Sequence, residues 1–343
     1  MKAKRPSLKD IAQQLKVSVT TVSFVLNGKG KEKGISQAVS EKILKYVEEI
    51  NYKPNQLARS LRTGKSRVIV FMVEDISNTF FARIARLIED IAYEKGYRIL
   101  FCSSENDDRK SEELIDLFIE RQVDGFIIIP SPGIQPTIEK LLRENIPVVL
   151  FDRYFPGLKS SYVIIDNEDS AYKATRHLID NGFRKIAFIT IDSEQTQMRD
   201  RLNGYRKAVQ EEGLQESLLV VPFRDSSLKK KQEILKNFLC REQDFDAVFF
   251  ATNYLTETGL FVIRENLPEM AEKWGILTFD DNSFFRIYSP AITAIAQPLE
   301  AISRELMEIL LDQIKNAGPR KSELIQRVLP AALIIRESSS GRK

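Results

Sequence analysis

The sequence is poor in the side chains on which most catalytic and metal sites depend. Its 343 residues include one histidine, two cysteines and one tryptophan. His177 lies in a stretch with the pattern of an amphipathic helix, so we expect a helical residue rather than a general base. Cys102 and Cys240 stand apart in apolar surroundings, which indicates reduced, structural thiols. We therefore expect no metal site and no cofactor.

The motifs of common enzymes are also missing. The chain has no G-x-S-x-G, no G-x-x-x-x-G-K-[ST] and no G-x-G-x-x-G, which would mark a nucleophile elbow, a phosphate-binding loop and a dinucleotide site. Gly64-Lys65-Ser66 reproduces only half of a phosphate loop. We expect no catalytic residue and no enzyme activity.

No apolar run approaches the ~20 residues that a membrane-spanning helix needs, and no apolar signal segment is found near residue 1. The sequence therefore predicts a protein without a membrane partner, in the cytoplasm and associated with the nucleoid. At 343 residues, the chain is long enough for two or three compact units, each with its own core.

Charge is distributed unevenly along the chain. The formal net charge is +3, but residues 1–67 contain 15 Lys and Arg against 5 acids. The remaining residues carry a net charge of −7. A basic head on an acidic body indicates that the head binds a polyanion and that the body does not.

The basic head contains a predicted pair of short helices, in the string SLKDIAQQLKVSVTTVSFVLNG of residues 7–28. Ser7 is an N-cap residue and Asp10 follows three positions later, which suits the first turn of a helix. The pattern breaks at residues 16–18, where a turn is predicted. Apolar residues at helical spacing are predicted to face inward in both helices: Leu8, Ile11, Ala12, Leu15, Val19, Val22, Val25 and Leu26.

The second helix of this pair has small hydroxyl side chains on its other face. Thr20, Thr21 and Ser23 are predicted to point outward, where they can approach base edges and phosphates closely. The pattern is typical of a helix-turn-helix, with an ordinary helical hairpin as the alternative. A third helix beginning after Ser36 is predicted to close the core with an apolar stripe of Val39, Ile43, Leu44, Val47 and Ile50.

From Arg67 onward, apolar strands alternate with amphipathic helices in two consecutive series of similar length. This alternation predicts two lobes, each built on a parallel sheet. Ligands of such sheets bind at the carboxyl ends of the strands, so the space between the lobes is the expected pocket. The fold class is therefore an α/β core of two parallel-sheet lobes with a small all-α headpiece.

Several strings, in this order, carry a resemblance to a known family. They are SLKDIAQQLKVSVTTVSFVLNG, NYKPNQLARSLRTGKS, SNTFFARI, GFIIIPS, FDR, RLNGYRKAV, ATN, FDD, AQPLE and LPAALIIRES. Together they resemble the lactose-repressor/purine-repressor family of bacterial transcription regulators over nearly the whole chain. The resemblance implies a homodimer with a helix-turn-helix headpiece, a hinge helix and a core similar to periplasmic sugar-binding proteins.

The resemblance implies domain boundaries. The headpiece spans 1–54, and the hinge helix with its linker spans 55–66. The core spans 67–336, before a tail of 337–343. Lobe 1 comprises about 67–165 and 297–327, and lobe 2 about 166–296 and 328–336.

The resemblance also implies which residues bind DNA. Val19, Thr20 and Ser23 would lie in the major groove, with Thr21 and Asn27 near phosphates. In the hinge, Ala58 and Leu61 would enter the minor groove, and Leu61 would wedge between base pairs; its alternative is packing on the headpiece core. The full predicted DNA-binding set is Ser7, Val19, Thr20, Thr21, Ser23, Asn27, Asn55, Ala58, Arg59 and Leu61.

For the effector, polar and aromatic residues just after strand ends are the physical candidates. The resemblance places Arg201, Asn253, Asp280 and Gln297 in contact with the effector, with Asp152 and Phe81 lining it. The full predicted effector-binding set is Phe80, Phe81, Asp152, Arg199, Arg201, Asn253, Asp280 and Gln297. Carboxylate, amide and guanidinium groups beside an aromatic ring suit a sugar or sugar phosphate. The alternative is that each is a solvated loop end or a structural ion pair.

Two positions depart from the family's pattern. The family often has arginine at the position of Phe24 and aspartate at the position of Tyr254, and these changes alter the expected operator contacts and ligand polarity. The sequence predicts a regulator, expected to be a repressor, that binds a palindromic double-stranded operator as a dimer. The rival is a solute-binding protein or a sugar-modifying enzyme with an incidental basic head.

Overall fold

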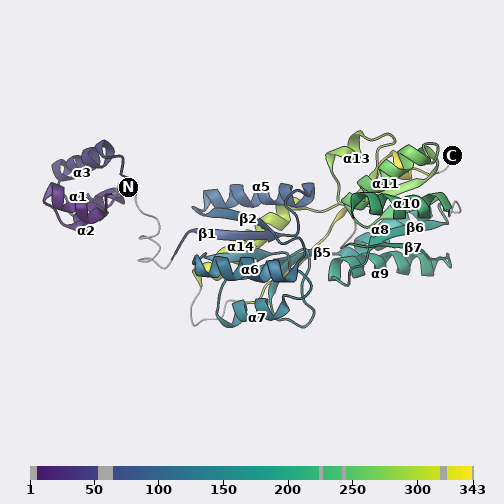
Figure 1. Cartoon of the computed structure of the whole chain (residues 1–343), viewed down its shortest axis with the longest axis horizontal. Coiled ribbons are helices and arrows are strands. Elements are labelled where there is room, and N and C mark those ends of the chain that lie inside the picture. Colours follow the sequence, from purple (N-terminus) through teal and green to yellow (C-terminus); the bar gives the residue numbers. More distant parts are fainter. Residues whose placement is uncertain (1–5, 53–64, 224–226, 242–244, 317–322, 342–343) are drawn as a thin grey trace. The chain divides into compact units, whose positions relative to one another are not determined.

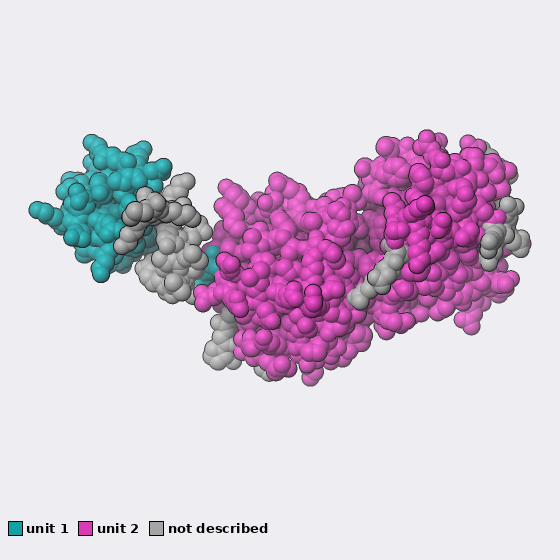
Figure 2. All heavy atoms as spheres, viewed as in Figure 1, with its two compact units in different colours: residues 1–66 teal, residues 67–343 magenta. Residues whose placement is uncertain are grey.

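The computed structural model describes residues 6–52, 65–223, 227–241, 245–316 and 323–341. The chain forms two compact units, residues 1–66 and residues 67–343 (Figure 2). No helix in the described ranges is both long and apolar enough to cross a membrane. The predicted hinge residues Asn55, Ala58, Arg59 and Leu61 lie outside the described residues.

The first unit is a three-helix bundle of α1 (Leu8–Leu15), α2 (Val19–Leu26) and α3 (Gln37–Glu49), labelled in Figure 1. The predicted capping at the start of α1 is confirmed, because Ser7 accepts from the Asp10 backbone and Asp10 accepts from the Ser7 backbone. Lys16 adopts a left-handed conformation (φ 54°) and ends α1. This residue makes the tight turn into α2.

The core of this unit is formed by apolar residues of all three helices, namely Ile11, Ala12, Leu15, Val22, Val25 and Ile43. Two residues predicted to face inward do not. Val19 is 41% exposed and Leu44 is 50% exposed. Val19 stands at the first position of α2. Leu44 follows the buried Ile43, and one residue rotates an α-helix by about 100°.

The second unit contains the two predicted sheets, and each has six strands. The first sheet has the order β11-β5-β4-β3-β1-β2, and all its pairings are parallel. Its strands are β1 (Val68–Val73), β2 (Arg98–Ser103), β3 (Gly125–Ile128), β4 (Val148–Phe151), β5 (Ser161–Ile165) and β11 (Gln326–Leu329). The helices that cover it are α5 (Thr79–Glu94), α6 (Asp108–Glu120), α7 (Gln135–Arg143) and α14 (Leu299–Lys315).

The second sheet has the order β12-β10-β9-β8-β6-β7, and only β12 is antiparallel to its neighbour. Its strands are β6 (Ile186–Ile191), β7 (Ser217–Val221), β8 (Ala247–Phe250), β9 (Gly275–Phe279), β10 (Thr293–Ala296) and β12 (Ala332–Ile334). Its helices are α8 (Asn167–Asp180), α9 (Thr196–Glu211), α10 (Leu228–Arg241), α11 (Asn253–Asn266), α12 (Met270–Lys273) and α13 (Ser283–Ile287), with η1 (Glu337–Ser339) near the end.

Alternate residues of each central strand pack on opposite faces. In β1, Ile69, Phe71 and Val73 belong to the same apolar cluster as residues of α5 and α14, whereas Val70 and Met72 pack with residues of α6 and α7. Figure 1 shows α5 on one face of this sheet and α6 and α7 on the other. Burial on both faces explains the nearly continuous apolar runs in the sequence.

Helices α8 and α9 approach each other closely at Gly204. A Cβ atom on Gly204 would collide with the backbone carbonyl of Glu168 and would lie 2.8 Å from the backbone nitrogen of Tyr172. Backbone atoms of a packed helix cannot move aside as a flexible side chain can. The glycine in the string RLNGYRKAV is therefore required for the packing of these two helices.

We predict that Gly204→Ala lowers the free energy of unfolding of the core by about 1–3 kcal/mol, because overpacking forces the two helices apart. Urea-induced unfolding of the full chain measures this loss. Asn203→Ala, at an exposed position of the same helix, is the matched control and should be neutral or slightly stabilising because alanine favours a helix. Equal stability of Gly204→Ala and the parent would contradict the packing argument.

Candidate functional site

The outer face of α2 presents small side chains near the basic loop that follows the helix. Val19 and Thr20 are exposed, whereas Thr21 and Ser23 are half-buried. Ser18 caps the helix by accepting from the Thr21 backbone nitrogen (2.9 Å). Its hydroxyl also contacts the Thr21 hydroxyl (2.8 Å). Val19 and Thr20 are therefore the side chains most accessible to a bound surface.

Asn27 and Phe24 each contact another residue of the first unit. The Asn27 side chain donates to the backbone carbonyl of Ser23 (2.6 Å), which fixes its amide at the end of α2. Phe24, where the family often has arginine, lies under the ammonium group of Lys33 at 5.8 Å from the ring centre. A lysine from the following loop thus brings a positive charge to the position that lacks arginine.

In the core, most of the predicted effector residues meet at the carboxyl ends of the two sheets. A cavity of about 40 Å³ is lined by Phe80, Phe81, Asp152, Arg201, Asn253 and Asp280. This volume is far below the ~300–1,000 Å³ typical of small-molecule sites. A ligand of sugar size therefore enters this cavity only if its walls move apart, and we call it the closed cavity.

Two of the predicted effector residues do not line this cavity. Gln297 does not line this cavity, but its side chain donates to the Asp280 carboxylate (2.6 Å). Arg199 lines a wider neighbouring cavity of about 490 Å³. Both cavities lie between the lobes and share Arg153 in their walls.

The guanidinium of Arg201 is held at the centre of the cleft by several groups. It donates from Nε to the Asn167 side chain (2.9 Å) and from Nη1 to the backbone carbonyl of Ala251 (2.8 Å). The central carbon of the guanidinium, Cζ, lies 3.7 Å from the ring centre of Phe279. Arg201 is 3% exposed, so its charge acts in an environment with little water.

Asp152 and Asp280 occupy matching places at the ends of β4 and β9. Both have left-handed backbone conformations, with φ of 67° and 69°, which are uncommon for residues with a side chain and occur at functional sites. Burial raises the pKa of Asp152 to about 6, against the pull of Arg153 and Arg201. Burial also raises the pKa of Asp280, opposed by Arg201 and by the Gln297 hydrogen bond.

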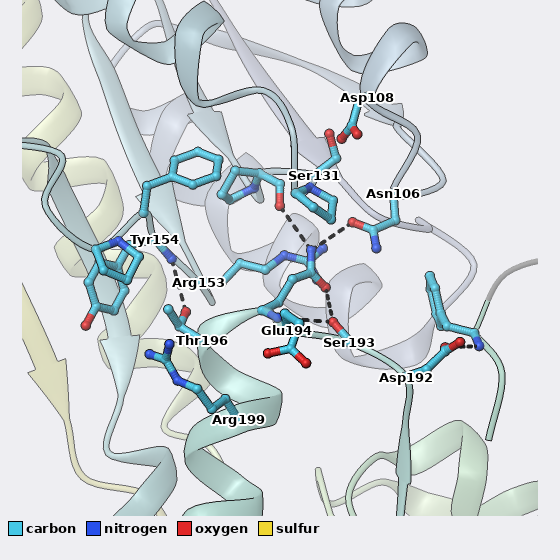
Figure 3. A pocket seen from close by; sticks show the side chains of 16 residues that line it. Asn106, Asp108, Ser131, Arg153, Tyr154, Asp192, Ser193, Glu194, Thr196 and Arg199 are labelled. Atoms are coloured by element: carbon cyan, nitrogen blue, oxygen red, sulfur yellow. Dashed lines mark hydrogen bonds between the residues drawn. The ribbon is translucent and has the colours of Figure 1, made fainter. Parts of the chain in front are cut away.

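A network of polar side chains links the two lobes beside this cavity. Arg153 of the first lobe forms a buried ion pair with Glu74 (2.8 Å) and donates to Gln195 of the second lobe (2.6 Å). Gln195 in turn donates to the side chain of Asn106 (3.0 Å) in the first lobe. Figure 3 labels Arg153 and Asn106, which both line the wider cavity of about 490 Å³. We call Glu74, Arg153, Gln195 and Asn106 the interlobe network.

A second link joins the helix starts on the other side of the cavity. The side chain of Asn253 donates to Asn78 (2.9 Å), and Asn78 donates back (3.4 Å). One predicted effector residue therefore serves as an interlobe contact in this closed arrangement. Beyond this pair lies a third cavity of about 750 Å³, which shares Glu74, Asn78, Asn253 and Tyr254 with the closed cavity.

Sequence reasoning missed several residues of the site. Glu74 and Gln195 follow strands, as the predicted residues do, and this placement could have identified them. Asn167, the first residue of α8, and Phe279, the last residue of β9, hold Arg201. Asn167 carries no signal in the sequence, because only the packing of α8 against α9 brings it to the arginine, whereas Phe279 directly precedes the predicted Asp280.

The geometry can be compared with known proteins. Residues 7–55 match the family described as bacterial regulatory proteins, lacI family, and residues 69–317 match the periplasmic binding protein domain. The HTH-type transcriptional regulator RegA of Clostridium saccharobutylicum is 32% identical over 336 residues, 97% of this chain and 99% of that protein. The chain belongs to the lacI family. It is an effector-responsive, DNA-binding transcriptional regulator rather than an enzyme, and the resemblance stated from the sequence is confirmed.

Solved structures show the same fold as this regulator. The lac repressor dimer bound to operator and the anti-inducer ONPF has a TM-score of 0.84 at 20% identity, over 99% of this chain and 100% of that chain. A complex of the transcriptional regulator CelR with cellobiose has a TM-score of 0.68 at 26% identity, over 97% and 100% of the two chains.

We predict that Asp152→Asn stabilises the regulator at neutral pH. The pKa of Asp152 in the folded state, about 6, exceeds the ~3.9 of an unfolded aspartate. The charged carboxylate therefore destabilises the folded state. This destabilisation grows as the pH rises from about 4 and reaches its full size above about pH 6. The variant should gain about 1–3 kcal/mol at pH 7.5 and less at pH 5.

Thermal unfolding of the full chain at the two pH values measures this difference. Asp116→Asn, the same change at an exposed position of α6, is the matched control and should show no gain that grows with pH. An equal or lower melting temperature of Asp152→Asn at pH 7.5 would contradict the prediction.

Proposed function

We propose that the regulator binds a palindromic operator as a homodimer and that a sugar-like effector in the interlobe cleft controls its affinity for DNA. The observation that carries the DNA-binding part is the outer face of α2, where Val19 and Thr20 are exposed on a separately folded basic unit. Short side chains there allow close approach to base edges in the major groove. In the cell the regulator acts in the cytoplasm, on the nucleoid.

Exposed apolar side chains on the second unit support a dimer. Tyr93 and Phe101 are exposed at the end of α5 and on β2, which is the last strand of the first sheet. Ile287, at the end of α13 in the second lobe, is 82% exposed. Large apolar side chains and an open sheet edge favour association with another protein surface. A symmetric dimer would present two copies of α2, which requires a two-fold operator.

The closed cleft supports control by a small molecule. Its walls bring aromatic rings together with carboxylate, amide and guanidinium groups, a combination that suits hydroxylated ligands. The CelR relative is bound to a sugar, cellobiose. A ligand that binds one arrangement of the lobes better than another shifts the population of arrangements, and with it the affinity for DNA.

We predict that Thr20→Ala weakens specific DNA binding by at least about ten-fold, because each good base contact contributes about 1–3 kcal/mol of discrimination. The operator is first selected from a pool of random DNA duplexes with the full chain, and we expect a palindrome bound by two chains. Electrophoretic mobility shift then gives the affinities.

The matched control is Thr137→Ala, the same change on α7 in the core, which should bind as the parent does. Selection of no sequence, or an affinity of Thr20→Ala equal to that of the parent, would contradict the proposed role of α2. Binding of the parent should also weaken steeply with added salt, because lysines and arginines displace counterions from the phosphates.

The predicted hinge lies outside the described residues, and its role rests on the resemblance. We predict that Leu61→Ala bends the operator less and binds it at least about ten-fold more weakly, since a leucine wedge offsets the unstacking of a base step, which costs about a few kcal/mol. Energy transfer between dyes on the two operator ends measures the bend.

The matched control is Leu117→Ala, at an exposed position of α6, which should bend and bind the operator as the parent does. If Leu61→Ala bends the operator as fully as the parent, the role of Leu61 as a wedge is refuted.

A further inference from the structure

The charges inside the closed cavity are unbalanced. Its walls contain three carboxylates, from Glu74, Asp152 and Asp280, but only two guanidinium groups, from Arg153 and Arg201. Glu74 and Arg153 neutralise each other in a buried ion pair at 2.8 Å. One arginine, Arg201, thus remains to balance two aspartates, the buried Asp280 and the half-buried Asp152. A carboxylate held partly away from water is costly unless its charge is fully balanced.

The remaining arginine is not paired directly with either aspartate. Arg201 donates its side-chain hydrogen bonds to Asn167 and to the backbone carbonyl of Ala251. Asp280 accepts from Gln297. Across the described parts of the chain, no hydrogen bond from a side chain and no ion pair reaches the Asp152 carboxylate. Asp152 is therefore the group with unused capacity to bind a cation.

Two further polar atoms in the same walls have no partner among the described residues. They are Oε1 of Gln197, an acceptor, and Nε of Arg153, a donor. Both side chains line the cavity and are more than nine-tenths buried, at 6% and 3% exposure. A buried polar group without a partner costs free energy that a bound ligand can recover. A ligand that reaches these atoms when the cavity widens can supply a donor to Gln197 and an acceptor to Arg153.

The adjoining cavity of about 750 Å³ is also negatively charged. Besides Glu74, its walls carry Asp75, Glu105, Asp107 and Glu257, against a single lysine, Lys231. It shares four wall residues with the closed cavity, so it forms one approach to it. Carboxylates around an opening attract cations and repel anions. Aromatic side chains that favour a nearby cation, among them Phe80 and Tyr254, line the closed cavity.

We propose that the effector carries an ammonium group together with hydroxyl groups, as in a 2-amino-2-deoxy sugar, and that Asp152 and Gln197 bind the ammonium. This inference rests on the proposed control by a ligand in the cleft and narrows its class. The ammonium supplies the missing positive charge and donates to Oε1 of Gln197. A hydroxyl oxygen accepts from Nε of Arg153. The surplus of carboxylates disfavours sugar phosphates, which the sequence had left open, and sugar acids.

The test measures binding of matched ligands to the full chain by isothermal titration calorimetry at pH 7. The probes are D-glucosamine, D-galactosamine and D-mannosamine, their parent sugars D-glucose, D-galactose and D-mannose, and the three corresponding 6-phosphates. We expect at least one amino sugar to bind at least about ten-fold more tightly than its parent, because a charge-assisted hydrogen bond is roughly twice as strong as a neutral one. The phosphates should bind most weakly.

Variants separate the ammonium contact from general effects on the cleft. Asp152→Asn should lower the affinity ratio of the amino sugar to its parent sugar to within about two-fold, and Gln197→Leu should also lower this ratio. Asp116→Asn, outside the cleft, should leave the preference unchanged. An unchanged preference in Asp152→Asn would overturn the assignment of the ammonium to this residue.

DNA binding distinguishes failure of this inference from failure of the proposed function. If a neutral sugar or a sugar phosphate binds more tightly than every amino sugar and shifts the affinity for the selected operator, control by the cleft stands and the ammonium is refuted. If none of the nine probes binds, the amino-sugar inference is also overturned, while the operator affinity of the unliganded chain still tests DNA recognition.

Discussion

The arrangement of the core depends on the partly buried hydrogen bond between Arg153 and Gln195, which joins the two lobes. Arg153 is fixed on its own lobe by Glu74, and Gln195 accepts from Ser193 of its own lobe and donates across the cleft to Asn106. Each partner is therefore bound on both sides of the cleft. With little water present, these bonds are stronger than they would be at the surface, and leaving one unmade would be correspondingly costly. The closed lobes in turn shrink the central cavity and bury its charges.

Three short connections limit how the lobes can move. The first connection runs from β5 of the first lobe, which ends at Ile165, to α8 of the second lobe, which begins at Asn167. The second runs from β10 of the second lobe, which ends at Ala296, to α14, which packs on the first lobe. In the third, two residues separate β11 of the first sheet from β12 of the second. Gln297 lies in the second connection and bonds Asp280 in the cleft. Asp280 is therefore hydrogen-bonded to a segment that joins the lobes. Such contacts give effector binding a route to the arrangement of the lobes.

Sequence patterns predicted the elements well and individual exposures less well. The capping box at Ser7, the parallel sheets and the identity of the strand-end residues followed from local chemistry and hydrophobic periodicity. Val19 and Leu44 were placed inside because periodicity locates an apolar stripe only to within about one residue on a short helix. Gln297 was expected beside the effector, which stays a prediction; the structure adds that it donates to Asp280, a contact that no local pattern encodes.

By itself, the sequence determined the family, the basic helix-turn-helix head, the two-lobed α/β core and the absence of catalytic motifs, because these follow from residue order, periodicity and charge along the chain. Only the tertiary structure decided how the charges of the cleft pair. Glu74 and Arg153 are 79 residues apart in sequence, and Arg201 is held by Asn167 and Phe279 from other elements. Which carboxylate remains unpaired depends on these distant contacts, and Asp152 emerges as that group only after the chain has folded.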